Sequence, residues 1–406
     1  MKGIIRFLVP LATALALAAC NSGGLSSVPS SSGQSTTGMQ SHHTPPEWQA
    51  KHLATAVCPA IPGKISCLAL LEKRAIGPDV AGWAPADIQT RYNLPSATAG
   101  SGQIVAIVDA YDNPNITSDL STYRTEFGLG TANFTKYNQN GQTSGFPSGN
   151  HNWGVEEDLD VQMVSAACPK CTIYLVEANS NNTSDLEAAE ATAVTLGAHI
   201  VSNSWICYAS SCGTSESDFD TAGVVYLAAS GDSGYNLNGP PSWFPTVVSV
   251  GGTVLAKSGS NYSETVWHGA GGGCSNNGSG AGQTKPSWQH DPSCAYRTDA
   301  DVAAVAWNVA EYDSYGYGGW ITIGGTSVAT PLNAGVFGLA GNASSVNAGE
   351  NFWKLKAKKQ KKYLHYISSG NDGSCSNSYL CTAGTNQFKT YAGPIGWGTP
   401  NGIKAY

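Results

Sequence analysis

Ser327 stands where a serine can act as a nucleophile. It follows the Gly-Gly-Thr sequence at 324–326 and precedes an apolar stretch, 328–340, with the composition of a helix. Pro331 would fall in the first turn of that helix, where proline is tolerated. A serine at a helix N-terminus lies beside unbonded amides and the positive end of the helix dipole, which together stabilise an oxyanion. A serine that only caps the helix would have the same sequence.

A nucleophilic serine needs a base, which in most enzymes is a histidine. None of the chain's eight histidines stands in a motif that marks a catalytic base. Glu156 and Asp160 offer an alternative, because residues four apart share one face if 155–166 is a helix. Like charges at this spacing repel, and such pairs raise one pKa and can share a proton. The competing interpretation is a pair of solvated surface carboxylates. The buried stripe of this helix would consist of Val155, Leu159, Met163 and Ala166.

A third carboxylic acid, Asp232, lies in the sequence Ser-Gly-Asp-Ser-Gly at 230–234. The apolar run that precedes it, 224–230, has the composition of a buried strand. Open α/β sheets bind their ligands at the carboxyl ends of strands, so Asp232 would face a site there. An aspartate that only stabilises a turn would look similar.

The segments that must position these side chains alternate between strands and helices. Continuous hydrophobicity in five runs indicates strands buried on both faces, as in a parallel sheet covered by helices. Between two of them, 184–198 is expected to be a helix that opens with a Ser184/Glu187 capping box and stops at Gly197. The pattern predicts a doubly wound α/β fold with a mostly parallel sheet and helices on both faces. The five runs are 103–111, 171–178, 199–205, 224–230 and 246–253.

The composition indicates an exported protein that is rich in loops. The chain has 406 residues, enough for a substantial core. Its net charge of −7 argues against nucleic acid as a partner. Only 12% of the residues are charged, whereas soluble proteins usually have about 25%. Much of the polarity comes instead from Gly, Ser, Thr and Asn.

The N-terminal region has the features of an export signal. Residues 1–20 have a basic start and a short apolar stretch, and end in Leu-Ala-Ala-Cys, which resembles a bacterial lipobox with Cys20 as the acylated residue. An ordinary signal peptide with an incidental cysteine is the alternative. We expect a flexible tether at 21–46, a short leader at 47–76 and a catalytic domain at 77–406. The chain would then be exported, either as a cell-envelope lipoprotein held at a membrane through Cys20 or as an extracellular protein.

The other ten cysteines fall into pairs that are close in sequence, which fits disulfides formed in an oxidising compartment. The motif Cys168-Pro-Lys-Cys171 could also be half of a zinc site or a redox pair, although no second motif supplies further ligands. The expected pairs are Cys58 with Cys67, Cys168 with Cys171, Cys207 with Cys212, Cys274 with Cys294, and Cys375 with Cys381.

Taken together, these segments resemble the sedolisins, or serine-carboxyl peptidases, which have a subtilisin-like fold and a glutamate in place of the subtilisin histidine. The resemblance extends over about 86–402. It rests on the joint order of the motifs, each of which is weak by itself. The motifs are Glu156-x-x-x-Asp160, 230–234, 271–273 with 285–289, 324–327 through Pro331, and 396–402.

The resemblance implies an endopeptidase that is active in acid. Ser327 would be the nucleophile, Glu156 the general base, and Asp160 the residue that orients Glu156 and shares a proton with it. Asp232 would hydrogen-bond the oxyanion together with the Ser327 amide. A carboxylate base works best in acid, and Asp232 can donate only when it is protonated. The substrates would be proteins or peptides, and the enzyme a monomer.

Two features depart from the family pattern. Sedolisins usually carry a long prodomain, whereas only about 55 residues separate Cys20 from the expected domain here. They also commonly hold a calcium ion near the C-terminus. At the matching positions this chain has Tyr366 and Ala392, so a hard cation would lack carboxylate ligands. The sequence therefore indicates no certain cofactor. A disulfide between Cys375 and Cys381 would stabilise the same region instead.

Other functions remain open from the sequence. A histidine-dependent subtilisin-like peptidase would use Asp109, His151 and Ser327, since Asp109 ends a predicted strand. A surface binding protein on a peptidase scaffold would be expected to have lost one of the four site residues. A serine esterase has no separate support. The lysine-rich stretch 354–362 would be a solvated helix face or a patch that touches anionic lipid.

Overall fold

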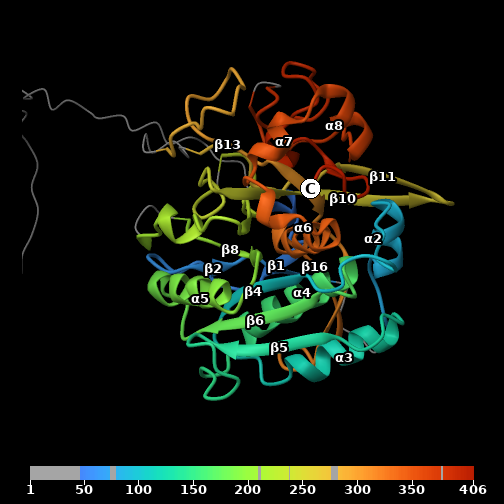
Figure 1. The fold of residues 1–406 in the computed structure, drawn as a ribbon. Helices are drawn as coiled ribbons and strands as arrows, with labels where there is room; N and C mark the ends of the chain where they lie inside the picture. The colour runs from blue at the N-terminus through green and yellow to red at the C-terminus, as the bar shows by residue number, and fades with distance from the viewer. Residues whose placement is uncertain (1–45, 74–78, 209–211, 237, 276–281, 376–377) are drawn as a thin grey trace, which may run out of the picture. The chain divides into compact units, whose positions relative to one another are not determined.

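The computed structural model describes residues 46–73, 79–208, 212–236, 238–275, 282–375 and 378–406 (Figure 1). These residues belong to one unit that extends over 43–406. The expected signal peptide with Cys20, and residues 21–45 of the expected tether, lie outside the described residues. Among the described helices, none has the length and apolar character that a membrane span requires.

The core is built on an eight-stranded sheet, in which neighbouring strands are parallel except for the β10–β11 pair. The strand order is β11-β10-β9-β7-β4-β6-β5, and β14 also pairs with β10. The mostly parallel sheet predicted from the sequence is therefore confirmed. Four of the five apolar runs contain one of its strands, and the fifth, 246–253, covers the first part of β10. The strands are β4 (Ile104–Ala110), β5 (Asn133–Asn138), β6 (Thr172–Ala178), β7 (Ile200–Asn203), β9 (Val225–Ala229), β10 (Val247–Ser258), β11 (Asn261–Val266) and β14 (Val302–Val305).

Helices cover both faces of this sheet, as predicted. Alternate residues of β4 point to opposite faces. Val105 and Ile107 join the apolar cluster that includes α4 and α6, whereas Ala106 and Val108 join the cluster that includes α5. The helices are α1 (Glu47–Ala50), α2 (Pro85–Arg91), α3 (Ile116–Glu126), α4 (His151–Ala167), α5 (Thr183–Thr195), α6 (Thr326–Ala340), α7 (Glu350–Lys354) and α8 (Ala357–Tyr363). Short 3-10 turns lie at Glu216–Phe219, Ala343–Ser345 and Gly393–Ile395.

Two predicted helix starts are wrong. Helix α5 begins at Thr183 after Asn182, and no side chain caps it, so the Ser184/Glu187 capping box does not form. The Glu187 carboxylate instead accepts a hydrogen bond from the Ser215 amide at 3.0 Å. Helix α6 begins at Thr326, two residues before the predicted start, which places Pro331 in its second turn. Because proline has no N–H, the Ser327 carbonyl loses its partner within the helix.

A second, smaller sheet joins the N-terminal segment, residues 46–73, to the rest of the domain. Its order is β1-β3-β16-β15, and β16 leads directly into α6. Another strand of the N-terminal segment, β2, pairs with β8. The sequence predicted one strand over 199–205, but the chain leaves the main sheet after Asn203, so this stretch forms β7 and the start of β8. The strands are β1 (Ala54–Ala56), β2 (Ser66–Cys67), β3 (Leu70–Glu72), β8 (Trp205–Ile206), β15 (Val309–Asp313) and β16 (Gly319–Gly324).

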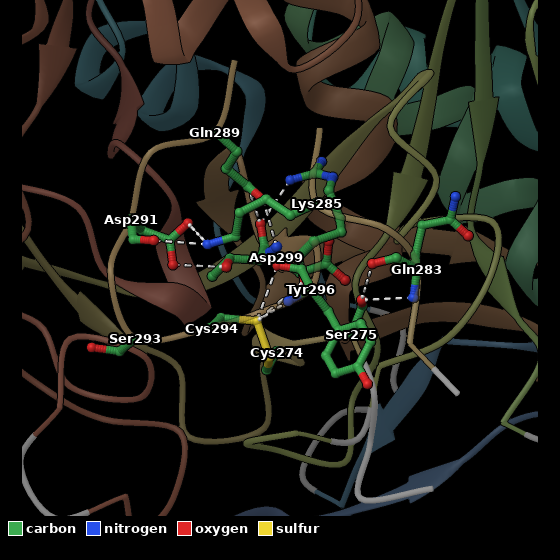
Figure 2. The surroundings of a disulfide bond; sticks show 12 residues. Cys274, Ser275, Gln283, Lys285, Gln289, Asp291, Ser293, Cys294, Tyr296 and Asp299 are labelled. Carbon is green, nitrogen blue, oxygen red and sulfur yellow. Dashed lines mark hydrogen bonds and ion pairs between the residues drawn. A yellow bond between two sulfur atoms is a disulfide. The ribbon is translucent and has the colours of Figure 1, made fainter. Parts of the chain in front are cut away.

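All five expected disulfides are present, so Cys168 and Cys171 pair with each other and form neither a zinc site nor a free dithiol. Figure 2 shows the Cys274–Cys294 bond and, beside it, the Lys285 side chain pointing toward Asp291. Their Nζ and Oδ1 atoms are 2.9 Å apart. Two short antiparallel pairs complete the fold: β12 (Gly273–Cys274) with β13 (Thr298–Asp299), and β17 (Leu364–His365) with β18 (Thr399–Pro400).

The lysine-rich stretch 354–362 is a solvated helical surface. It extends from the end of α7 through most of α8, and its lysines are exposed. Lys354 pairs with Glu350, one turn earlier in α7, at 2.6 Å. This arrangement agrees with the interpretation of 354–362 as a solvated helix face.

The contact between α4 and α6 yields a test of the packing. A Cβ atom on Gly335 of α6 would lie 2.7 Å from the Cβ of Ala167 in α4. Helix propensity alone would make Gly335→Ala stabilising by about 1 kcal/mol. We expect the opposite sign, a loss of about 1–3 kcal/mol from overpacking, measured by urea unfolding. The control is Ala191→Gly on the exposed side of α5, which reports propensity alone. A stabilised Gly335→Ala protein would contradict this packing.

Candidate active site

Helix α4 carries Glu156 and Asp160 into the centre of the domain. Both side chains are fully buried. The sequence predicted a helix with one buried stripe, but α4 is buried on all sides from Trp153 onward, because α2, α3, α6, β4 and β15 pack around it. The interpretation of Glu156 and Asp160 as solvated surface carboxylates is therefore wrong.

Ser327 is the second residue of α6 and is also fully buried. Its hydroxyl donates to the Ser204 carbonyl at 3.3 Å. The Ser204 hydroxyl in turn donates to Asp160 Oδ1 at 2.8 Å and lies 3.4 Å from the Ser327 carbonyl that Pro331 leaves without a helical partner. Ser204 thus links the serine to the carboxyl pair. No sequence motif marks Ser204, although it follows the end of β7 much as Asp232 follows β9.

The Glu156 carboxyl group has one occupied and one free oxygen. Oε2 accepts the backbone amides of Leu68 at 3.0 Å and Ala69 at 2.7 Å. Oε1 has no hydrogen-bond partner among the described residues. Burial, followed by the charge of Asp109, raises the pKa of Glu156 well above its usual value, and the nearby Ser327 side chain opposes this rise.

Asp160 and Asp109 extend the group of buried acids. Burial raises the pKa of Asp160 well above its usual value, and the charges of Asp109 and Glu156 add to the shift. Burial also raises the pKa of Asp109 to about 8. Since the charge of Asp109 disfavours ionisation of Glu156 and Asp160, and that of Glu156 disfavours ionisation of Asp160, the Glu156–Asp160 pair can share one proton and leave one carboxylate to act as a base.

Asp232 faces the same site from the end of β9, next to the turn that precedes α6. Its Oδ1 accepts the Thr326 amide and the Thr326 hydroxyl, each at 2.8 Å. Its Oδ2 is buried and has no partner in the described part of the chain. Burial raises the pKa of Asp232 to about 7, against the opposing effect of the Thr326 hydrogen bonds. Below that pH the group is protonated and can donate a hydrogen bond from Oδ2.

The structure thus brings together the four side chains singled out from the sequence. Ser327 and Asp232 meet at the start of α6, and Glu156 with Asp160 approach the serine from α4. The charge of Asp232 and the Ser327 side chain both affect the pKa of Glu156. This arrangement has a hydroxyl group, a buried carboxyl pair and a separate proton donor, which are the parts that acyl transfer requires.

The geometry does not support the histidine-dependent alternative. His151 is exposed at the start of α4, and its Nδ1 lies 2.9 Å from the Tyr315 carbonyl. Both carboxylate oxygens of Asp109 lack hydrogen-bond partners within the described ranges, so no histidine is bound to it. In a serine-histidine-aspartate triad, the aspartate accepts a hydrogen bond from the imidazole.

The residues at the expected calcium positions do not fit a hard cation. Tyr366 and Ala392 supply no carboxylate, and the nearby Ser369 and Gly396 carbonyls accept the amides of Val266 and Ala392.

A cluster of three buried carboxyl groups lies elsewhere, with one oxygen of each within 4.8 Å of the others. Protein groups satisfy these carboxyls: Ser314 donates to Asp119, Asn113 to Asp158, and backbone amides to Asp313. The cluster therefore does not need an ion to satisfy its hydrogen bonds.

The buried acids determine how stability depends on pH. Burial raises the pKa of Asp109 to about 8 and that of Asp299 to about 7, whereas an unfolded chain titrates its aspartates near 3.9. Between about pH 4 and pH 8 the folded protein holds protons that the unfolded chain has lost. The free energy of unfolding should therefore fall as pH rises through this window. Melting followed by circular dichroism should show the highest Tm at the acidic end, and Asp109→Asn should flatten the slope. A Tm that rises toward neutral pH would contradict the expected protonation.

Comparisons with curated proteins give two relatives. The chain is 27% identical over 361 residues to sedolisin of Pseudomonas sp. (strain 101), which covers 78% of the chain and 60% of the relative. It is 26% identical over 379 residues to xanthomonalisin of Xanthomonas sp. (strain T-22), which covers 76% of the chain and 44% of the relative. The matches thus span 60% and 44% of the lengths of these relatives. A scan of protein-family models found no match.

A comparison of folds agrees with the sequence comparison. A solved structure of Pseudomonas sedolisin, described as a serine-carboxyl proteinase complexed with two molecules of pseudo-iodotyrostatin, superimposes with a TM-score of 0.65 at 24% identity. The match covers 80% of this chain and 96% of that one. The motif order and these two relatives make the chain similar to the sedolisins, and its fold is subtilisin-like.

Proposed function

We propose that the protein is a serine-carboxyl endopeptidase that hydrolyses proteins or peptides at acidic pH. The observation that carries the proposal is that the Ser327 side chain acts on buried Glu156 and is linked through Ser204 to Asp160, while the preceding residue, Thr326, donates to Asp232. The related proteins named sedolisin and xanthomonalisin support the same reaction class.

In the proposed reaction, Ser327 Oγ attacks the carbonyl carbon of the substrate while Glu156 accepts its proton. Asp160, held by the Ser204 hydroxyl, shares a proton with Glu156 and so adjusts its basicity. Glu156 then gives the proton to the leaving amine, as a general acid. Water hydrolyses the resulting ester by the reverse sequence of proton transfers.

Asp232 would stabilise the tetrahedral intermediate. Its Oδ1 is fixed by two hydrogen bonds from Thr326, so Oδ2 is the oxygen that carries the proton toward the oxyanion. The unbonded amides in the first turn of α6 add to this effect. Since burial raises the pKa of Asp232 to about 7, the group would donate in mild acid and lose its proton above that pH.

We also propose that the enzyme works outside the cytoplasm as a monomer, with a lipid anchor at Cys20. The lipobox-like sequence at 17–20 supports the anchor, and five disulfides among the described residues support an oxidising compartment.

The nucleophile can be tested directly. Hydrolysis of an acid-denatured protein is followed between about pH 3 and pH 7, the range set by carboxyl titration. Ser327→Ala and Glu156→Gln should each lose about 10⁴-fold or more in kcat, because the first removes the nucleophile and the second the proton acceptor. The control is Asp220→Asn, at an exposed position, which should keep the parent rate. Equal activity of Ser327→Ala and the parent would remove the proposed site.

The role of Asp232 predicts a change in pH profile. Asp232→Ala should lower kcat by about 10²–10³-fold, the usual cost of one oxyanion donor. Asp232→Asn keeps an acceptor for Thr326 and provides an N–H that does not titrate. The loss of activity above pH 7 should therefore be less steep in Asp232→Asn than in the parent protein. Parallel profiles of kcat against pH for these two proteins would exclude Asp232 as the group whose ionisation limits the rate.

A further inference from the structure

The C-terminal part of the chain carries a positive charge that the rest of the chain lacks. Residues 341–406 contain eight of the 21 lysines and arginines but only two of the 28 acids, Glu350 and Asp372. The first 340 residues are left with 13 basic residues against 26 acidic ones. Both acids of the C-terminal part are buried, so its lysines determine the charge of its surface.

The eight lysines all face solvent. Six of them lie in 354–362, and the others are Lys389 and Lys404. Figure 1 shows α7 and α8, where the stretch 354–362 lies, at the top of the view. In α8, Gln360 is buried and four lysines occupy the opposite arc of about 160°, since successive residues of a helix are about 100° apart. We call the eight lysines the basic surface.

Tertiary packing adds the two isolated lysines to the helical ones. Lys362 and Lys404 both lie over the ring of Tyr363, at 5.7 and 6.0 Å from its centroid. Lys389 lies 5.7 Å from the ring of Trp397, which packs against α7. The basic surface is therefore built from three separate segments of the chain.

The positive charge of the basic surface is not balanced within the described part of the chain. Only Lys354 forms an ion pair there, with Glu350 at 2.6 Å. Lys358 and Lys362 are four apart in α8, and like charges at this spacing destabilise a helix. Lysines near the start of α8 also oppose the helix dipole. A helix with a structural role alone would gain from a carboxylate at one of these positions, so the pattern favours an anionic partner outside the chain.

An exposed aromatic side chain follows the lysines in sequence. Tyr366 comes four residues after Lys362 and is 38% exposed. Tyrosine combines an apolar ring with a hydroxyl group and is enriched where lipid headgroups meet hydrocarbon. Lysine stems can likewise cover apolar surface while their ammonium groups stay in water. Both kinds of side chain thus suit contact with a bilayer.

A bilayer fits the basic surface better than an acidic protein does. The proposed reaction takes place in acid, where the carboxylates of a protein, with pKa values near 4, lose their charge. The phosphodiester groups of phospholipids are much stronger acids and keep theirs. A bilayer also presents these groups side by side in a plane, so that several lysines can contact them at once.

We propose that the basic surface binds the phosphodiester headgroups of an anionic phospholipid bilayer. The attraction is electrostatic, and each lysine held near an anionic bilayer strengthens binding about fivefold. This inference goes beyond the proposed peptidase function and does not depend on it.

The described chain begins within reach of the basic surface. The Glu47 amide donates to His268 Nδ1 at 3.1 Å. Two residues earlier in the same segment, the Val266 amide donates to the Ser369 carbonyl at 2.9 Å, and Ser369 follows the end of α8 by six residues. Along this path of contacts, Glu47 is at most about 40 Å from α8, because an extended chain advances no more than about 3.6 Å per residue.

The proposed lipid anchor at Cys20 would add to this contact. Cys20 and Pro46 are 26 positions apart, which an extended chain spans in at most about 95 Å. An acylated Cys20 and the basic surface can therefore meet the same bilayer. Because the anchor makes the second contact intramolecular, even weak binding by the lysines would orient the domain on the membrane. The orientation depends on the anchor, whereas the binding does not.

The test uses the full chain carrying Cys20→Ser, which cannot be acylated at that position. Sedimentation with vesicles is measured at about pH 5, where lysines are charged. Vesicles of phosphatidylcholine with about 30% phosphatidylglycerol should bind at least about tenfold more tightly than vesicles of phosphatidylcholine alone. Binding should weaken at least about fivefold between about 0.1 M and 0.5 M salt, as the screening length shortens. Equal binding to the two kinds of vesicle would overturn the inference.

A matched pair of quadruple variants in the same background locates the contact. The first removes the charges of α8 and should weaken binding about 100-fold or more. The second removes four charges from exposed positions outside the basic surface and should bind within about threefold of the parent. The α8 variant is Lys358→Gln, Lys359→Gln, Lys361→Gln and Lys362→Gln. The control variant is Lys51→Gln, Lys73→Gln, Lys170→Gln and Lys257→Gln.

The outcomes of this comparison decide between a local surface and overall charge. Equal losses in the two variants would mean that only net charge matters, and would overturn the inference. Melting followed by circular dichroism shows whether both variants are folded. If the α8 variant does not fold, the lipid and salt dependence of the parent still tests the proposal.

A soluble polyanion tests the alternative partner. At about pH 5 polyglutamate is still largely ionised, so it competes on equal terms. Tighter binding of polyglutamate than of the phosphatidylglycerol vesicles would assign the basic surface to acidic proteins and overturn the inference. A protein that binds the vesicles but hydrolyses no substrate would leave this inference standing and contradict the proposed function.

Discussion

The structure depends on keeping carboxylic acids uncharged in its interior. Among the described residues, seventeen aspartates and glutamates are buried but only two arginines and no lysine. Moving an ionised carboxylate out of water costs several kcal/mol unless a partner compensates, and too few cations are buried to pair with these acids. Protons must therefore neutralise many of them. The same requirement applies to Asp232, which must carry a proton to donate a hydrogen bond, so the fold and the proposed chemistry both favour acid.

The parallel sheet brings the site together from distant parts of the chain. Its strands place Ser204, after β7, and Asp232, after β9, at one edge, because parallel strands have their carboxyl ends on the same side. Helix α4 brings the Glu156–Asp160 pair to this edge, and close packing of Gly335 on Ala167 keeps α6 against α4. The positions of the base and the nucleophile are thus set by helix packing, and that of the third acid by the sheet.

Strands β8 and β16 join the N-terminal segment through their backbones. Strand β8 pairs with β2, and β16 pairs with β3, while Leu68 between them packs in a small apolar cluster. These pairings build residues 54–72, which the sequence predicted as part of a short leader at 47–76, into the sheets of the domain.

The sequence by itself determined the features that depend on local pattern. These are the buried strands, the helix that carries Glu156 and Asp160, the five disulfide pairs between near neighbours, and the order of the family motifs. Local pattern failed at the start of α5, where tertiary contact with the Ser215 amide engages Glu187. Only the tertiary structure decided three other features. These are the full burial of α4, the link through Ser204, and the passage of Leu68 and Ala69 between Glu156 and Gly325. Each joins residues that are tens to hundreds of positions apart, and periodicity along a chain contains no information about which distant surfaces will meet.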